Sequence, residues 1–240
     1  MSVSILHHQT VVIIGGSSGI GYAVAEGALA EGARVMIGSS SQAKVDAATQ
    51  RLGAGASGAV VDVRDEDSVA AFFGALESFD HLVFTAGDGA AAAPVPLSQL
   101  DIAAASAGLK VRFWGALMAI KHAQPRLSEH GSITLTNGLL AHMPRKGVPL
   151  ATAFAGAIEH LVRGLAVDLA PLRVNSVCPG PVLTELLAPW PADVIRKMTE
   201  RQPLPRAADP AEVAQAYLYL MRGGCTTGQV LIVDGGRMLV

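Results

Sequence analysis

Seven short apolar runs, rich in β-branched residues, recur along this 240-residue chain at fairly even spacing. Stretches with helical spacing and a high content of Ala, Leu, Glu and Arg separate them. Strands that alternate with helices form right-handed βαβ units, and uniformly apolar runs indicate strands buried on both faces. The sequence therefore predicts a doubly wound α/β fold with a mostly parallel sheet and helices on both faces. The runs are Val11–Ile14, Arg34–Ile37, Ala59–Val61, Leu82–Phe84, Ile133–Thr136, Arg173–Val177 and Val230–Val233.

The composition limits the kinds of protein and the cellular locations that fit this fold. Half of the residues are hydrophobic and 16% are charged, which suits a large core and argues against disorder. The formal net charge is −2 without a basic block, so no nucleic-acid partner is expected. The absence of a long apolar run and of a basic leader predicts a cytoplasmic protein with no membrane partner. No repeat or linker is visible, so residues 1–240 are predicted to form one domain.

Cysteine and histidine give no sign of a metal site in the sequence. Cys178 and Cys225 are the only two cysteines, too few for a disulfide framework or a metal cluster. Adjacent His7 and His8 are more typical of a surface. No metal site is predicted.

A glycine-rich turn, IGGSSGIG, follows the first apolar run and opens a helix. Gly15 permits a tight exit from the strand, Gly19 lets the backbone approach a pyrophosphate, and Gly21 lets helix and strand pack closely. The amino end of the helix then offers N–H groups and a positive dipole to phosphate. The alternative is a glycine turn without a ligand; the strand before it and the helix after it favour a nucleotide. Ser17, Ser18 and Ile20 complete the predicted turn site.

The ends of the next strands carry the predicted adenosine contacts. The second strand ends in Ser39 and Ser40 without the carboxylate that would bind a ribose 2′-hydroxyl, which favours NADP(H) over NAD(H). Ser40 or Ser41 could equally cap the following helix. After the third strand, Asp62 could meet the adenine amino group while Val63 covers the ring. Small Ala86 and Gly87 after the fourth strand let a cofactor pass close to the backbone.

At this point the chain resembles the short-chain dehydrogenase/reductase family over almost its full length. The resemblance implies a single Rossmann domain with a seven-stranded parallel sheet, a nicotinamide cofactor, and a homodimer or homotetramer. It implies that Pro179, Gly180, Val182 and Thr184 line the nicotinamide side, and that loops 88–97 and 179–200 border the substrate. The matching pieces are Gly15–Gly21, Asp62–Val63, Thr85–Gly87, Gly131–Thr134, Arg173–Leu186 and Thr227–Gly236.

The chain departs from the family pattern mainly in its catalytic half. The family reduces a carbonyl with a Tyr acid, a Lys four residues later, a Ser that orients the carbonyl and an Asn on the preceding helix. Here those positions hold Ala151, Ala155, Gly138 and Arg112. No tyrosine of this chain has a lysine four residues later, so no shift of register restores the pair. A milder departure is Thr85, where the family usually has Asn, which is expected to loosen the turn.

Three residues near these positions are candidate substitutes. Arg112 could stabilise an oxyanion or grip a carboxylate, or could be a surface or interface residue. Asn137 could hydrogen-bond a carbonyl, or could only tie down the strand end. His142, four residues past Gly138, is the natural replacement acid, although an exposed loop histidine is more common.

Three functions fit this pattern. The first is an NADP(H)-dependent oxidoreductase that acts on a small molecule by a mechanism without the Tyr–Lys acid. The second is a nucleotide-binding pseudoenzyme with a regulatory or scaffold role. The third is a non-redox enzyme, such as a cyclase or lyase, that uses the same cleft. The resemblance favours the first.

Overall fold

The structure, a computed structural model, describes residues 6–87, 94–107 and 109–240. Seven strands form one sheet in the order β3-β2-β1-β4-β5-β6-β7, and every neighbouring pair is parallel. The doubly wound α/β prediction is confirmed, and all seven apolar runs belong to strands. The strands are β1 Thr10–Ile14, β2 Arg34–Ser39, β3 Ala56–Val60, β4 Phe79–Phe84, β5 Leu127–Thr136, β6 Arg173–Pro179 and β7 Val230–Val233.

Strand β3 shows the largest offset from its prediction. The apolar run predicts a strand over Ala59–Val61, whereas the strand covers Ala56–Val60. It lies at the edge of the sheet and consists of small, partly exposed residues. Because this edge strand is not fully buried on its two faces, its sequence need not be apolar throughout, and an apolar run does not locate its ends.

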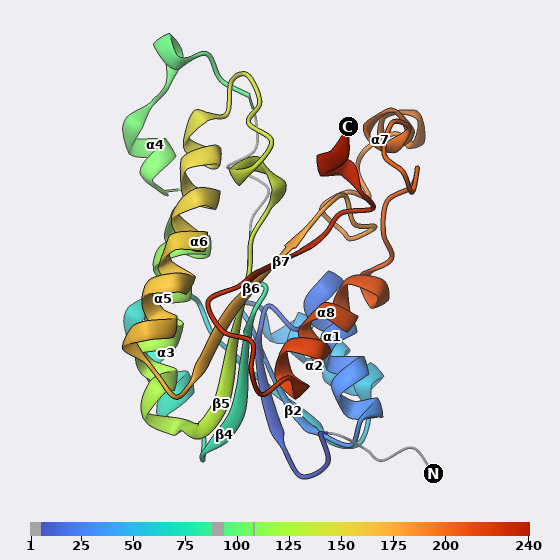
Figure 1. The fold of residues 1–240 in the computed structure, drawn as a ribbon. Helices are drawn as coiled ribbons and strands as arrows, with labels where there is room; N and C mark the ends of the chain where they lie inside the picture. Colours follow the sequence, from blue (N-terminus) through green and yellow to red (C-terminus); the bar gives the residue numbers. More distant parts are fainter. Residues whose placement is uncertain (1–5, 88–93, 108) are drawn as a thin grey trace.

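Helices cover both faces of the sheet (Figure 1). Helices α1, α2 and α8 pack on one face, and α3, α5 and α6 pack on the other. Along β1, Val11 and Ile13 join the first core while Val12 and Ile14 join the second, as expected for a strand buried on both sides. The α-helices are α1 Gly19–Ala30, α2 Gln42–Leu52, α3 Glu66–Gly74, α4 Ile102–Ala107, α5 Ala116–Ala123, α6 Pro149–Asp168, α7 Ala192–Thr199 and α8 Pro210–Arg222.

Shorter helical segments join these elements. The most relevant to the site is η3, a π-helical segment that runs directly into α5 and carries Arg112. Another, η5, follows β5 and leads to His142. These segments are η2 Leu97–Gln99, η3 Lys110–Gly115, η4 Gln124–Arg126, η5 Leu139–Ala141 and η6 Arg237–Leu239.

Of the two loops predicted to border the substrate, the structure describes one only in part, and the other contains a helix. Residues 88–93 of the first loop lie outside the described residues. The second, 179–200, is irregular over its first part but ends in helix α7, which stands above the sheet beside the chain end in Figure 1.

Helix α6 is long and apolar. It has 20 residues, and its mean hydropathy of 1.3 would suit a membrane span by length and composition alone. It also carries Glu159, His160 and Arg163, and it packs against β6 as part of the fold. One such helix is weak evidence for a membrane span, and α6 is one of the helices that cover the sheet in the α/β architecture.

Candidate functional site

A cleft of about 850 Å³ lies where the strands end at their carboxyl edge. Open α/β sheets bind ligands at this edge. Every residue predicted to contact the cofactor lines this one cleft: Gly15, Ser17, Ser18, Gly19, Ile20, Gly21, Ser39, Ser40, Asp62, Val63, Ala86, Gly87, Pro179, Gly180, Val182 and Thr184. The candidate substitutes Arg112 and Asn137 line it too, whereas His142 is not among its lining residues.

The turn after β1 is shaped by backbone geometry. Gly15 has φ +90°, and a Cβ added there would lie 2.6 Å from the amide nitrogen of Ala86. The hydroxyl of Thr85 donates to the carbonyl oxygens of Ile14 and Gly15, at 3.2 Å in each case. Thr85 thus braces the turn through its hydroxyl at the position where the family usually has Asn.

The amino end of α1 opens toward the cleft. Its N-cap residue, Ser18, makes no side-chain capping bond. The first-turn N–H groups and the helix dipole are therefore available to an anion. Nearby, the Ser17 hydroxyl donates to the Ser39 hydroxyl at 3.0 Å, which joins the turn to the end of β2. This arrangement fits a pyrophosphate.

Two cations lie at the adenosine end of the cleft. Ser41 caps α2 by accepting from the amide of Lys44 at 3.4 Å, while Ser39 and Ser40 line the cleft. Lys44 and Arg64 line the cleft as well. Sequence reasoning missed both cations because it looked only at the residues directly after β2. Lys44 is in the first turn of α2, and Arg64 follows the end of the neighbouring strand.

Asp62 holds one of these cations. Its carboxylate accepts from Nε of Arg64 at 2.9 Å and from Nη2 at 2.8 Å. The amide of Arg64 also donates to Oδ1 at 3.0 Å. These hydrogen bonds lower the pKa of Asp62. Asp62 is where the adenine contact was predicted, and its carboxylate also fixes the position of Arg64 beside the cleft.

The end of the cleft near Gly138 and Ala151, where the sequence predicts the catalytic residues to lie, has few groups that could donate a proton. Gly138 and Ala151 line it and offer no acidic side chain. Several large apolar residues line the same cleft: Leu140, Phe154, Leu186, Leu187 and Trp190. Small residues beside apolar walls leave room for a bulky apolar molecule.

One phenol lies below this end of the cleft. The hydroxyl of Tyr217, on α8, is 2.6 Å from that of Thr136, a lining residue. Tyr217 is fully buried, and burial raises its pKa further above the ordinary value. It is not among the lining residues and is unsuited to give a proton at neutral pH.

Arg112 reaches into the cleft from η3. A Cβ added at Gly87 would lie 2.8 Å from Nη2 of Arg112 and 2.9 Å from its Cζ. The guanidinium group therefore rests against the Gly87 backbone, at the end of β4. The Arg112 side chain therefore points into the cleft, toward the carboxyl end of β4.

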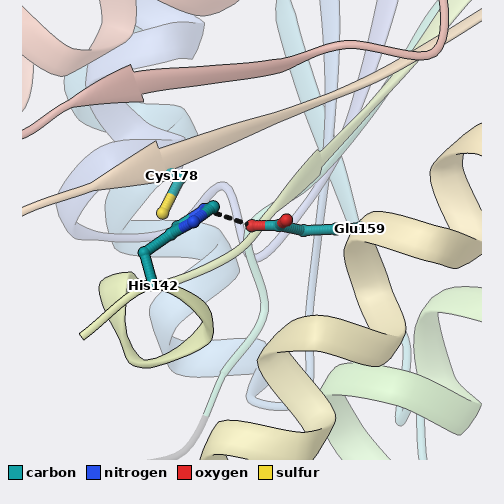
Figure 2. Close-up of side chains that lie close together, drawn as sticks. All are labelled: His142, Glu159 and Cys178. Atoms are coloured by element: carbon teal, nitrogen blue, oxygen red, sulfur yellow. Dashed lines mark ion pairs between the residues drawn. The ribbon is translucent and has the colours of Figure 1, made fainter. Parts of the chain in front are cut away.

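Asn137 and His142 meet at a buried carboxylate that sequence reasoning missed. Glu159, on α6, is only 6% exposed, and its Oε1 accepts from Nδ2 of Asn137 at 3.0 Å. Nε2 of His142 lies 2.6 Å from the same oxygen (Figure 2). Glu159 follows Ala151 by eight residues and Ala155 by four, so the three share one helix face. An acidic residue on the apolar core side of a helix was the signal available in the sequence.

Cys178, at the end of β6, lies beside this pair. The thiol is fully buried. Burial, with the charges of Glu159 and Asp234, raises its pKa to about 12. Since a thiolate is the reactive form, Cys178 is not a nucleophile in this state.

Comparison with known proteins identifies the class. A family model described as enoyl-(acyl carrier protein) reductase matches residues 15–237. The chain belongs to the short-chain dehydrogenase/reductase family of oxidoreductases.

Individual relatives cover the whole chain. Short-chain dehydrogenase/reductase ATR9 of Stachybotrys chlorohalonatus is 37% identical over 96% of this chain and 97% of its own. The solved structure of MalC reductase/Diels-Alderase from Malbranchea aurantiaca has a TM-score of 0.91 and 33% identity, with complete coverage of both chains. A small-chain dehydrogenase in complex with NADPH has a TM-score of 0.81 and 31% identity, over 97% of this chain and 100% of that one.

Proposed function

We propose that this protein is an NADP(H)-dependent oxidoreductase that reduces a bulky, largely apolar small molecule without the Tyr–Lys acid. One observation carries the proposal. The same cleft is lined by an intact phosphate cradle and by Arg112 and Asn137, whereas positions 138 and 151 carry no proton donor. The acceptor is a ketone, an imine or a conjugated C=C bond.

The cofactor fits the adenosine half of the cleft. The amino end of α1 would hold the pyrophosphate, and Ser39, Ser40, Lys44 and Arg64 would surround the 2′-phosphate of NADP(H). A relative of this chain was solved with NADPH, which supports this choice over NAD(H). When bound, the nicotinamide supplies a hydride equivalent to the acceptor.

Asn137 and Arg112 are the groups proposed to contact the acceptor. Because an ionised carboxylate only accepts hydrogen bonds, Glu159 fixes the amide of Asn137 with its NH₂ group toward Oε1. The second N–H of that group can donate to a carbonyl oxygen. Arg112 stabilises the negative charge that develops on the acceptor but keeps its own proton. His142 is the proposed proton source: it protonates the Glu159 carboxylate that it contacts, the proton passes through solvent in the cleft to the reduced acceptor, and His142 is reprotonated from solvent.

The protein is proposed to act in the cytoplasm as a homodimer or homotetramer. In the single chain only Ile158, Glu159 and Val162 of helix α6 are buried, so most residues of this apolar helix are at least partly accessible to a partner subunit. Sedimentation at micromolar concentration tests this part, since a monomer throughout would contradict it.

The test of the proposed activity is NADPH oxidation over a panel of bulky ketones, imines and enones. Turnover that is saturable in both NADPH and acceptor, and lost in Arg112→Met, supports the proposal. Tight NADPH binding without turnover on any acceptor contradicts it and favours the pseudoenzyme.

A non-redox reaction in the same cleft is the second candidate. The observation that favours it is the space left at Gly138 and Ala151 between apolar walls. A relative 33% identical to this chain is described as both a reductase and a Diels-Alderase. Conversion of a diene substrate at an equal rate with and without NADPH would identify this activity.

A further inference from the structure

Three side chains of metal-binding type converge beside the cleft. His142 comes from the residue after η5, Glu159 from α6 and Cys178 from β6. One ligand atom of each lies within 4.8 Å of the other two (Figure 2). The three elements belong to the folded core or are tied to it, so the group is held by tertiary structure rather than by one flexible loop.

The group contains a buried carboxylate with which a cation could pair. Glu159 is a buried carboxylate, and among the ion pairs of the described residues its one basic partner is His142. A second carboxylate, Asp234, adds to the negative field at the Cys178 thiol. A buried charge is costly unless it is paired or binds a metal. In the metal-free protein, Glu159 has only the His142 imidazole and the Asn137 amide as described side-chain partners.

We propose that His142, Glu159 and Cys178 form a zinc site. Nε2 of His142, a carboxylate oxygen of Glu159 and Sγ of Cys178 are the three protein ligands. With the carboxylate and a thiolate as ligands, the charge of Zn²⁺ is neutralised, and the imidazole binds as a neutral donor. The Cys178 proton is released to solvent when the metal binds.

The donor set selects zinc among common divalent ions. A thiolate, an imidazole and one carboxylate suit a borderline-soft ion, whereas Mg²⁺ and Ca²⁺ prefer oxygen ligands alone. Three protein ligands leave one tetrahedral position for water. The His142 side chain keeps 27% of its surface accessible, so solvent can reach this side of the group.

The inference does not depend on the proposed reaction. It concerns metal binding by three side chains and holds for an enzyme or a pseudoenzyme. In the zinc-bound protein His142 is a ligand, so its proposed role as proton source belongs to the metal-free protein. The site is linked to the cleft because Glu159 also holds Asn137.

Cobalt spectroscopy tests the site directly. Metal-free, tag-free protein is titrated with Co²⁺, and one equivalent should produce a thiolate-to-cobalt charge-transfer band that Zn²⁺ then removes. Cys178→Ser should abolish the band. Glu159→Gln and His142→Gln should weaken Zn²⁺ binding by at least about 100-fold, because even the loss of an outer hydrogen-bond partner costs about 10- to 100-fold.

Matched controls separate this site from adventitious binding. Cys225→Ser removes the other cysteine, and His160→Gln removes the exposed histidine next to Glu159; both should bind like the parent. The absence of a charge-transfer band overturns the proposal. So does binding that survives both Cys178→Ser and Glu159→Gln, or that is lost when His7 and His8 are replaced by Gln. Glu159→Gln preserves side-chain shape, so a folding failure of Cys178→Ser leaves the test decisive.

Discussion

The two ends of the cleft are built by different means. The phosphate end is built mainly from backbone, namely a glycine turn and the amino end of α1. The Thr85 hydroxyl supports this turn by donating to two of its carbonyl oxygens. The catalytic end would depend on single side chains, and the positions assigned to the family's Ser and Tyr hold Gly138 and Ala151. Backbone amides persist through most substitutions, whereas a proton donor disappears with one. Cofactor binding and proton delivery can therefore diverge independently.

The catalytic end has not lost all of its polar groups. Arg112 and Asn137 line the cleft, and Glu159 lies one helical turn beyond Ala155 on α6. Polar side chains are therefore present near Gly138, Ala151 and Ala155, although none of these three positions carries one. The difference between the two ends gives four predictions.

The largest effect is expected at Arg112. Arg112→Met should lower kcat for NADPH-dependent reduction by about 10²- to 10³-fold, because loss of one donor to a developing oxyanion has this size. NADPH affinity should stay within about twofold, since the phosphate end is untouched. Steady-state kinetics and calorimetry measure the two quantities.

Arg163→Met is the matched control, since Arg163 is exposed on α6. Equal losses of kcat in both variants, or a loss of NADPH affinity without a loss of kcat in Arg112→Met, would remove Arg112 from the catalytic end.

Gly15→Val should weaken NADPH binding by about 100-fold or more. A side chain at φ +90° is strained by about 1–3 kcal/mol, and its Cβ would collide with the Ala86 amide. Calorimetric titration with NADPH measures this change. Gly164→Val, at an exposed glycine of α6 with open space around it, should bind NADPH normally. Unchanged affinity in Gly15→Val would show that the turn does not hold the cofactor.

Lys44→Met should reduce the preference for NADPH over NADH by about 3- to 10-fold, the scale of one exposed charge-assisted contact. Affinity for NADH itself should not change. Fluorescence titrations with both cofactors give the ratio. Lys121→Met removes a lysine that pairs with Glu66 on the surface and should leave the ratio unchanged. An equal loss for both cofactors in Lys44→Met would rule out a 2′-phosphate contact.

The smallest effect on the cleft is expected from His81, which lies within β4. Burial lowers its pKa from 6.5 to about 4, and it contacts Ser132 and Gln9. The unfolded chain binds this proton more readily, so stability rises with pH between about 4 and 6.5 and is lost as pH falls through that range. The free energy of unfolding should fall by about 2 kcal/mol between pH 7.5 and 5.

His81→Gln should remove this part of the pH dependence without changing NADPH affinity at pH 7.5. Denaturant unfolding at both pH values provides the check. A pH slope that is the same in the variant would assign the dependence to other groups.

The fold was predictable because its signal is repeated. Seven apolar runs between amphipathic stretches each reflect a strand buried on both faces, and only edge strand β3 shifted. The lining of the phosphate end was also predictable, since glycines at fixed spacing leave few backbone conformations.

The catalytic end was less predictable, since its contacts join distant segments. Asn137, His142 and Glu159 were separate residues in the sequence, and a buried glutamate in an apolar helix gave no sign of its partners. The same holds for Cys178, which the sequence linked to no partner and whose sulfur lies within 4.8 Å of ligand atoms of His142 and Glu159. Lys44 and Arg64 were missed because they lie on separate segments, the first turn of α2 and the residues after β3, that both reach the cleft.

The central claim is that the cofactor cradle persists in a chain without the usual proton donor. Calorimetric titration of the purified protein with NADPH tests it most directly. The account predicts saturable binding at one NADPH per chain, tighter than for NADH and lost in Gly15→Val. No heat with either reduced cofactor at millimolar concentration, from a protein shown to be folded, would contradict it.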